Sequence, residues 1–258
     1  MFSASRFFED VRVYAPPVGR THHVQRLPDG RTAIALRLLD GGSGDLSVTG
    51  PRTKALFKSP IGIKRVVVWQ FKPGWSASLL GVPAHVLTDR HVHLEELWGD
   101  AARELCLELL ATPDSSAVTD RIFRAIAARI EDHASAFEPA SARLARRAVR
   151  LIEAGMVRVE DVAAEMGVTA RHLRRAFAEH IGVGPKDFAR GVRLQRAVRM
   201  ATVSADWGRI ATAAGYYDQA HLIADFKDLV GLTPVAYLKR IASDSSKVQR
   251  ARTATLHA

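Results

Sequence analysis

The chain has 258 residues, one cysteine and a net charge of +10. Its length predicts two domains, and the single cysteine, Cys106, excludes an intramolecular disulfide and fits a reducing cytoplasm. The sequence contains no run of about 18 apolar residues, and charged residues interrupt its start, so we expect no signal peptide, no membrane contact and a cytoplasmic location.

The positive charge is concentrated in the second half of the chain. Residues 1–142 carry 17 Lys and Arg against 16 Asp and Glu, whereas residues 143–258 carry 20 against 11. Such an excess is the electrostatic footprint of a nucleic-acid-binding domain. Because each phosphate contact releases condensed counterions, binding should weaken steeply with salt.

Residues 1–133 are predicted to form a β-rich domain that ends in helices. Strands are expected at 32–39, 45–48 and 65–71, and turns at 28–30 and 41–44. From Leu94 the apolar period becomes helical, and residues 112–116 separate two helices. We expect this domain to bind an effector or to mediate oligomerisation, and residues 134–142 to be a linker.

Two alternatives would make the first domain an enzyme. A cupin-like metal centre could use its histidines, which are His22, His23, His85, His91 and His93. No acidic residue forms a recognisable ligand motif with them, so we expect ordinary surface or core histidines and no cofactor. A repair methyltransferase would need a reactive cysteine, whereas Cys106 lies among leucines in a predicted helix, with no basic neighbour to activate it. The sequence therefore predicts a protein that is not an enzyme.

The C-terminal third contains the same pattern twice. The first copy is Val162-Ala163, Gly167, Leu173, Phe177, Gly182, Pro185 and Phe188, and the second is Ile210-Ala211, Gly215, Leu222, Phe226, Gly231, Pro234 and Tyr237. A repeat that keeps its register over more than about twenty positions indicates two copies of one supersecondary unit.

Each unit is predicted to be a helix, a tight turn and a second helix. In the first copy, the first helix ends at Gly167, where a left-handed C-cap is favourable, and Thr169 can cap a helix that runs to about His180. The apolar stripe of that helix is Ala170, Leu173 and Phe177, and its opposite face carries Arg171, Arg174 and Arg175. Such a face is either merely solvated or reads guanine edges and phosphates in a major groove. The repeat and the charge distribution favour contacts with bases and phosphates over a merely solvated face.

A long helix is predicted between the two units, from Pro185 to about Thr202. About 17 helical residues span roughly 26 Å, which suits two reading helices in successive major-groove segments about 34 Å apart. Arginines recur at every third position of this helix, at Arg190, Arg193, Arg196 and Arg199. Contact with phosphate and bracing of the helix are both open roles for them.

These residues, in this order, resemble the AraC/XylS family of bacterial transcription regulators over about residues 143–240. The resemblance implies an all-α domain with two helix-turn-helix motifs on a linking helix, which reads promoter DNA, and it implies that positions 171, 174 and 175 face bases. Several short N-terminal motifs are similar to the first domain of one branch of that family: Leu27-Pro28-Asp29-Gly30, Gly50-Pro51, Phe71-Lys72-Pro73-Gly74, Leu87-Thr88-Asp89-Arg90 and Leu97-Trp98-Gly99. In the wider family such domains sense a small molecule, dimerise, or both.

The second copy lacks the arginine face of the first. Ala220, Ile223 and Ala224 stand where the first copy has its arginines. Gln219 and His221 remain as polar contacts, with Tyr217 and Asp218 as further candidates. We therefore hypothesise that the first motif supplies most of the affinity and most of the sequence reading.

The sequence as a whole predicts an α+β protein that regulates transcription by binding double-stranded promoter DNA. The predicted DNA-binding residues are Thr169, Arg171, His172, Arg174, Arg175, Arg193, Arg196, Gln219 and His221. As an activator the protein would contact RNA polymerase; a small-molecule effector, control by a protein partner and a homodimer stay open. Residues 241–258 are polar and basic and are expected to form a disordered tail.

Overall fold

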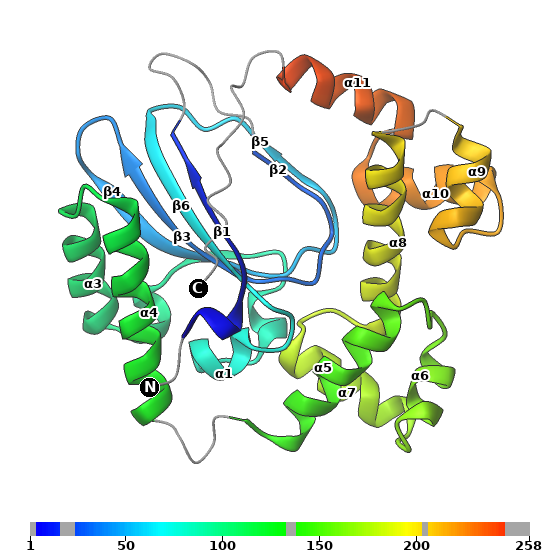
Figure 1. The fold of residues 1–258 in the computed structure, drawn as a ribbon, viewed down its shortest axis with the longest axis horizontal. Helices are drawn as coiled ribbons and strands as arrows, with labels where there is room; N and C mark the ends of the chain where they lie inside the picture. Colours follow the sequence, from blue (N-terminus) through cyan, green and yellow to red (C-terminus); the bar gives the residue numbers. More distant parts are fainter. Residues whose placement is uncertain (1–3, 16–23, 133–137, 203–205, 246–258) are drawn as a thin grey trace.

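A computed structural model describes residues 4–15, 24–132, 138–202 and 206–245 (Figure 1). The N-terminal part is built on β-strands with flanking helices and the C-terminal part is helical, which is the α+β arrangement that the sequence predicts. Among the described helices, none is long and apolar enough to cross a membrane.

Most strands belong to one antiparallel sheet, in the order β1-β6-β3-β4-β7, and β2 and β5 form a separate two-stranded ribbon. The strands are β1 (Phe8–Tyr14), β2 (Val24–Arg26), β3 (Ala33–Leu39), β4 (Gly44–Thr49), β5 (Leu56–Lys58), β6 (Ile63–Phe71) and β7 (His91–His93). The predicted strands correspond to β3, β4 and β6. Four strands were not predicted: β1, and the strands β2, β5 and β7, whose three residues are too few to establish an alternating pattern.

Helices α3 (Asp100–Leu110) and α4 (Ser115–Asp132) cover one face of the sheet (Figure 1). Alternate residues of β6 point into this core, where Val67, Trp69 and Phe71 are buried. The indole N–H of Trp69 donates to the hydroxyl of Thr119 on α4, at 3.2 Å. These two helices confirm the helical period that the sequence shows after Leu94.

Shorter elements complete the N-terminal domain. They are the 3₁₀ helices η1 (Ala4–Phe7) and η2 (Ala84–Leu87) and the helices α1 (Ser76–Leu80) and α2 (Glu95–Trp98). Both α1 and η2 pack against a helix of the C-terminal part, α7 (Ala170–His180).

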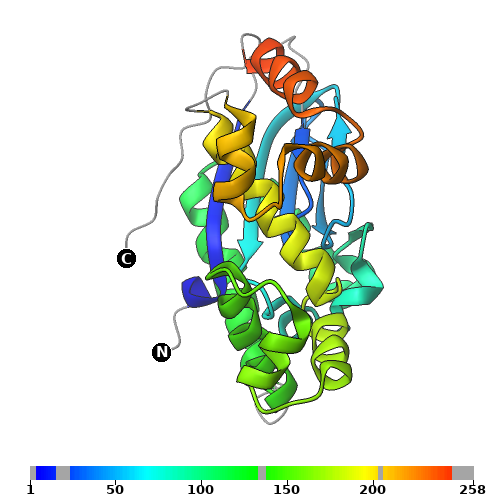
Figure 2. The ribbon, with the colours of Figure 1, turned by 90° about the vertical axis from the view of Figure 1, so that its right-hand side faces the viewer.

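The C-terminal part consists of two modules joined by a long helix, α8 (Pro185–Ala201) (Figures 1 and 2). The first module contains α5 (Ala140–Glu153), α6 (Val159–Glu165) and α7, and the second contains α9 (Trp207–Ala214), α10 (Gln219–Val230) and α11 (Pro234–Ser245). Each module has its own hydrophobic core, centred on Phe177 and Phe188 in the first and on Phe226 and Tyr237 in the second.

Two boundaries differ from those expected. Residues 140–142 were assigned to the linker, but they form the first turn of α5, because Ala142 is buried. Residues 241–245 were assigned to a disordered tail, but they continue α11, where Ile241 packs against the second core. Residues 246–258 lie outside the described residues.

The first module contains a buried histidine at the end of α7. His180 is 3% exposed, and its Nε2 atom lies 2.8 Å from the hydroxyl of Ser141 on α5. Burial lowers the pKa of His180 below its ordinary value, and the neighbouring Glu179 opposes this shift only in part.

Acidification should therefore destabilise the first module. Above about pH 6.5 the imidazole is neutral in both states, so its contribution is fully present; below that pH the unfolded chain takes up a proton that the folded chain resists. We expect the melting temperature to fall between about pH 7.5 and pH 5.5. In His180→Gln the fall should be smaller, because glutamine takes up no proton in either state over this pH range.

Thermal unfolding of both proteins at both pH values checks this. His91, whose pKa is also lowered by burial, is present in both proteins and serves as the internal control. An equal loss of melting temperature in the two proteins would contradict the account.

Candidate nucleic-acid interface

The first repeat folds as a helix, a turn and a helix. The chain leaves α6 through Gly167, whose φ of +65° is left-handed and therefore favours glycine. Thr169 then caps α7, because its hydroxyl accepts a hydrogen bond from the backbone N–H of His172 at 3.2 Å. Thr169 thus shapes the turn, as its position in the sequence predicts.

Helix α7 separates its apolar and basic residues onto opposite faces. Leu173 and Phe177 are fully buried in the core of the first module. The opposite face is exposed and carries Arg171, His172, Arg174 and Arg175. The guanidinium of Arg174 lies 3.2 Å from the carboxylate of Glu160 on α6, an exposed ion pair that DNA could replace. The face therefore presents a compact cluster of cationic side chains at the first half of a helix.

The second repeat folds in the same way. Gly215 ends α9 with a φ of +91°, and Asp218 caps α10 by accepting the backbone N–H of His221 at 2.7 Å. Asp218, one of the further contacts considered from the sequence, is thus engaged with its own helix. Its carboxylate stabilises the positive end of the α10 dipole.

The first half of α10, Gln219 to Ala224, carries no Lys, Arg, Asp or Glu side chain. Gln219 and His221 are exposed there together with Ala220 and Ala224, whereas Ile223 packs partly against the second core. The Nδ1 atom of His221 accepts a long hydrogen bond, 3.5 Å, from the backbone N–H of Tyr217. A neutral imidazole arranged in this way carries its proton on Nε2 and can donate from that atom to a phosphate.

The turn before α10 also exposes an aromatic side chain. Tyr217 is 90% exposed despite its large aromatic ring. Its neighbour Tyr216 is buried. The two reading helices, α7 and α10, therefore differ in character: the first is cationic and the second is neutral and polar.

The arginines of α8 have partners inside the protein. Arg193 is largely buried, with its guanidinium 5.3 Å from the centre of the Tyr216 ring, and Arg196 donates to the backbone carbonyl of Glu153 at 3.2 Å. These contacts favour the bracing role over the phosphate role that the sequence also left open. As DNA contacts, Arg193 and Arg196 stay predictions.

A buried ion pair that the sequence analysis missed joins α8 to α10. Arg190 lies 2.6 Å from the carboxylate of Asp225, which is only 8% exposed. Asp225 stands between Leu222 and Phe226, on the apolar side of α10. The sequence could have predicted this pair from the charged residue in that apolar stripe, because carboxylates are seldom buried without a partner.

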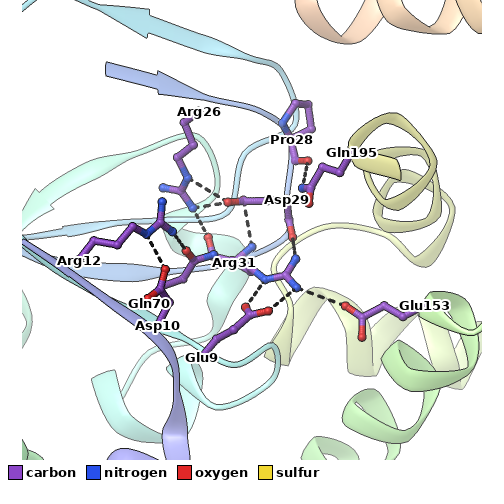
Figure 3. A network of polar contacts seen from close by, with 10 residues as sticks. All are labelled: Glu9, Asp10, Arg12, Arg26, Pro28, Asp29, Arg31, Gln70, Glu153 and Gln195. Atoms are coloured by element: carbon purple, nitrogen blue, oxygen red, sulfur yellow. Dashed lines mark hydrogen bonds and ion pairs between the residues drawn. The ribbon is translucent and has the colours of Figure 1, made fainter. Parts of the chain in front are cut away.

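The N-terminal domain lies on the other side of α8 from α9 (Figure 1), and it contacts the C-terminal end of α10. Its turn at residues 28–31 contacts α5 and α8 (Figure 3). Arg31 lies 3.3 Å from the carboxylate of Glu153 on α5 and also pairs with Glu9, while Gln195 on α8 donates to the carbonyl of Pro28 at 2.8 Å. These contacts leave the exposed faces of α7 and α10 uncovered.

The histidines of the first domain were the candidates for a metal centre. His91 and His93 lie on the same face of β7, as their spacing predicts, and the His91 ring lies 3.3 Å from the guanidinium of Arg37. Within the part of the chain that the structure describes, no three His, Cys, Asp or Glu side chains are grouped to hold a metal ion. His22 and His23 lie outside that part.

Cys106 was the candidate for a reactive thiol. It is partly buried against the core of the first domain, and burial raises the pKa of its thiol above the ordinary value. A raised pKa leaves less thiolate, so this environment does not activate the sulfur.

Comparison with known proteins agrees with this geometry. Residues 162–240 match the family model described as a helix-turn-helix domain. The chain is 38% identical over 105 residues to a probable bifunctional transcriptional activator/DNA repair enzyme AlkA of Mycobacterium tuberculosis, covering 38% of this chain and 20% of that protein. It is 32% identical over 146 residues to the HTH-type transcriptional regulator GlxA of Rhizobium meliloti, covering 49% of this chain and 45% of that protein.

Two solved structures are also similar to the chain. An AraC-type regulator from Chromobacterium violaceum is 25% identical, with a TM-score of 0.36, and the match covers 40% of this chain and 95% of that one. ToxT from Vibrio cholerae is 13% identical, with a TM-score of 0.44, and the match covers 89% of this chain and 96% of that one. The chain thus spans between a fifth and a half of the curated relatives it matches. The family match shows that residues 162–240 are a helix-turn-helix domain, and the two capped helix pairs have the geometry of such motifs.

Proposed function

We propose that the protein regulates transcription by binding promoter DNA with α7 and α10 in successive segments of the major groove. The observation that carries this proposal is the pair of capped helices, each with its apolar stripe buried and its opposite face exposed. A helix-turn-helix motif presents its second helix to base edges in this way.

The two motifs are expected to contribute unequally. Arg171 and Arg175 can each form a bidentate pair with guanine or hold a phosphate, whereas Gln219 can pair with adenine. Charged contacts also release counterions, so the α7 side should supply most of the affinity and most of its salt dependence. Exposed Tyr217 adds an aromatic contact beside the second motif.

Several finer points belong to the same proposal. The N-terminal domain is proposed to control the DNA-binding part, through a small molecule, a protein partner or a second copy of the chain. Activation would require contact with RNA polymerase. A regulator of this kind works in the bacterial cytoplasm, where promoter DNA lies.

An enzyme with a DNA-targeting module is the alternative function. The name of one relative includes a DNA repair activity, but the match extends over only 20% of that protein. Partial burial of Cys106 and the Arg37 contact of His91 favour structural roles for these two side chains. A stoichiometric metal in the purified protein, lost in His91→Ala, would favour the enzyme instead.

Selection from a random duplex library tests the proposed function directly. The full chain should enrich duplexes of about 30 base pairs that contain two conserved elements roughly one helical turn apart. Sequencing of the bound fraction gives both elements. Enrichment of no common sequence, or of a single element, would overturn the proposal of two reading helices.

Single substitutions test the inequality of the motifs. Arg175→Ala should weaken binding to the selected duplex by about 5- to 150-fold, which is about 1–3 kcal/mol, and lower the slope of affinity against salt by about one. Gln219→Ala should cost less and leave the salt slope unchanged. Fluorescence anisotropy titrations at several salt concentrations measure both quantities.

Arg124→Ala is the matched control, because Arg124 is exposed on α4, away from the reading helices. It removes the same charge and should leave the affinity within about twofold. A larger loss from Gln219→Ala than from Arg175→Ala would contradict the proposed division of labour.

A further inference from the structure

Both reading helices are held at their C-terminal ends by one short segment of the N-terminal domain, Pro51–Ala55. At one end of this segment, Pro51 packs against Gly182, just after α7. A Cβ atom on Gly182 would lie 2.6 Å from the Cγ atom of Pro51 and 2.8 Å from the carbonyl oxygen of Ala84. The hydroxyl of Thr88 donates to the Gly182 carbonyl at 2.6 Å. There is no free space at this contact.

The other end of the segment caps α10. The backbone N–H of Ala55 donates to the carbonyl of Leu229 at 2.8 Å, and the Lys54 ammonium donates to the carbonyl of Asp228 at 2.7 Å. A helix leaves its last four carbonyls without partners inside the helix, at the negative end of its dipole. A backbone N–H and a cation from the N-terminal domain thus satisfy two of these carbonyls in the second reading helix.

The Asp228 side chain strengthens this attachment. Its carboxylate accepts hydrogen bonds from Lys54 and from Arg190 of α8, both at 2.5 Å. These two bonds lower the pKa of Asp228 to about 2, so the carboxylate is charged at neutral pH. The end of α10 is therefore attached both to the linking helix and to the N-terminal domain.

Asp89 fixes the shape of the segment between these two ends. Its carboxylate accepts hydrogen bonds from the backbone N–H of Thr53, at 3.0 Å, and from the hydroxyl of the same residue. The Asp89 backbone N–H donates to the Pro51 carbonyl at 2.8 Å, and Arg52 donates to the Asp89 carbonyl at 3.0 Å. Among the described residues, Asp89 alone combines a side chain with a positive φ, +59°, a conformation that aspartate tolerates better than most residues.

The segment is short compared with the structure that it joins. Consecutive Cα atoms are 3.8 Å apart, so Pro51 and Ala55 are separated by at most about 15 Å. Helix α8 connects the two modules along one line, and a single helix leaves each module able to pivot about its end. A second, short and internally bonded connection restricts that pivoting.

We propose that Pro51–Ala55, held in shape by Asp89, is a spacer that sets the separation and relative angle of the two reading helices on DNA. The residues Lys54, Thr88 and Asp89 are then positioning residues for DNA recognition, although none of them lies on a reading face. This inference rests on the proposed function, because it assumes that α7 and α10 bind DNA together.

Altered operator spacing gives the test. The duplex selected by the full chain is synthesised with its two elements moved closer or further apart by one base pair. The wild-type protein should lose about 30-fold or more in affinity at either altered spacing. The double variant Lys54→Met, Thr88→Val should lose less than about 5-fold on the same duplexes, because its reading helices can adjust.

Matched variants separate positioning from general damage. Lys58→Met removes an exposed lysine of β5 and should keep the wild-type spacing preference. Asp89→Gly removes the carboxylate at a left-handed position without strain and should relax the preference. Asp89→Asn keeps one carbonyl acceptor for Thr53 and should restore most of it. Circular dichroism and melting temperatures establish that each variant is folded, and the Asp89 pair carries the test if the double variant is not.

The possible outcomes separate the role of Pro51–Ala55 as a spacer from the proposed binding of DNA by two helices. A spacing preference that is unchanged in both the double variant and Asp89→Gly would overturn the inference and leave the proposed function standing. An equal loss of affinity at every spacing would also overturn it, since that result marks a purely structural role. A wild-type protein that binds no two-element duplex would overturn the proposed function and this inference together.

Discussion

A helix that reads DNA has to leave the first half of one face exposed, so it can be anchored only by its apolar stripe and by its C-terminal end. The protein meets this constraint twice. The stripes of α7 and α10 are buried in separate cores, around Phe177 and Phe226. The C-terminal ends are held from outside the modules, at Gly182 and at Leu229, by contacts with the N-terminal domain. Unpaired carbonyls at a helix end require partners when they are covered, and here another domain supplies them.

The same constraint explains why the two repeats can differ in chemistry. Their turns, caps and apolar stripes set the fold, whereas the residues on the exposed faces do not affect it. Arg175 can therefore stand in one copy and Ala224 at the corresponding place in the other, with no change in the shape of the helix. A duplicated frame of this kind permits one motif to supply charge and the other to supply selective polar contacts, as we propose for α7 and α10.

Local chemistry made the frame of the C-terminal part predictable from the sequence. The conformational preference of Gly167 predicts a turn, and the hydrogen-bonding preference of Thr169 predicts a helix cap. The structure has both. Contacts between distant segments were not predictable in this way. Nothing near Lys54 in the sequence indicates a partner at Asp228, and the three-residue strand β5 is too short for a pattern. The partial burial of Arg193 likewise depends on Tyr216, which another helix positions.

The central claim is that one chain presents two reading helices to one side of DNA, in a fixed relation. Hydroxyl-radical footprinting of the full chain on its selected duplex measures this most directly. The account predicts two protected patches on the same face of the duplex, about one helical turn apart, with the deeper protection over the element that α7 contacts. A single patch, or two patches on opposite faces, would contradict it.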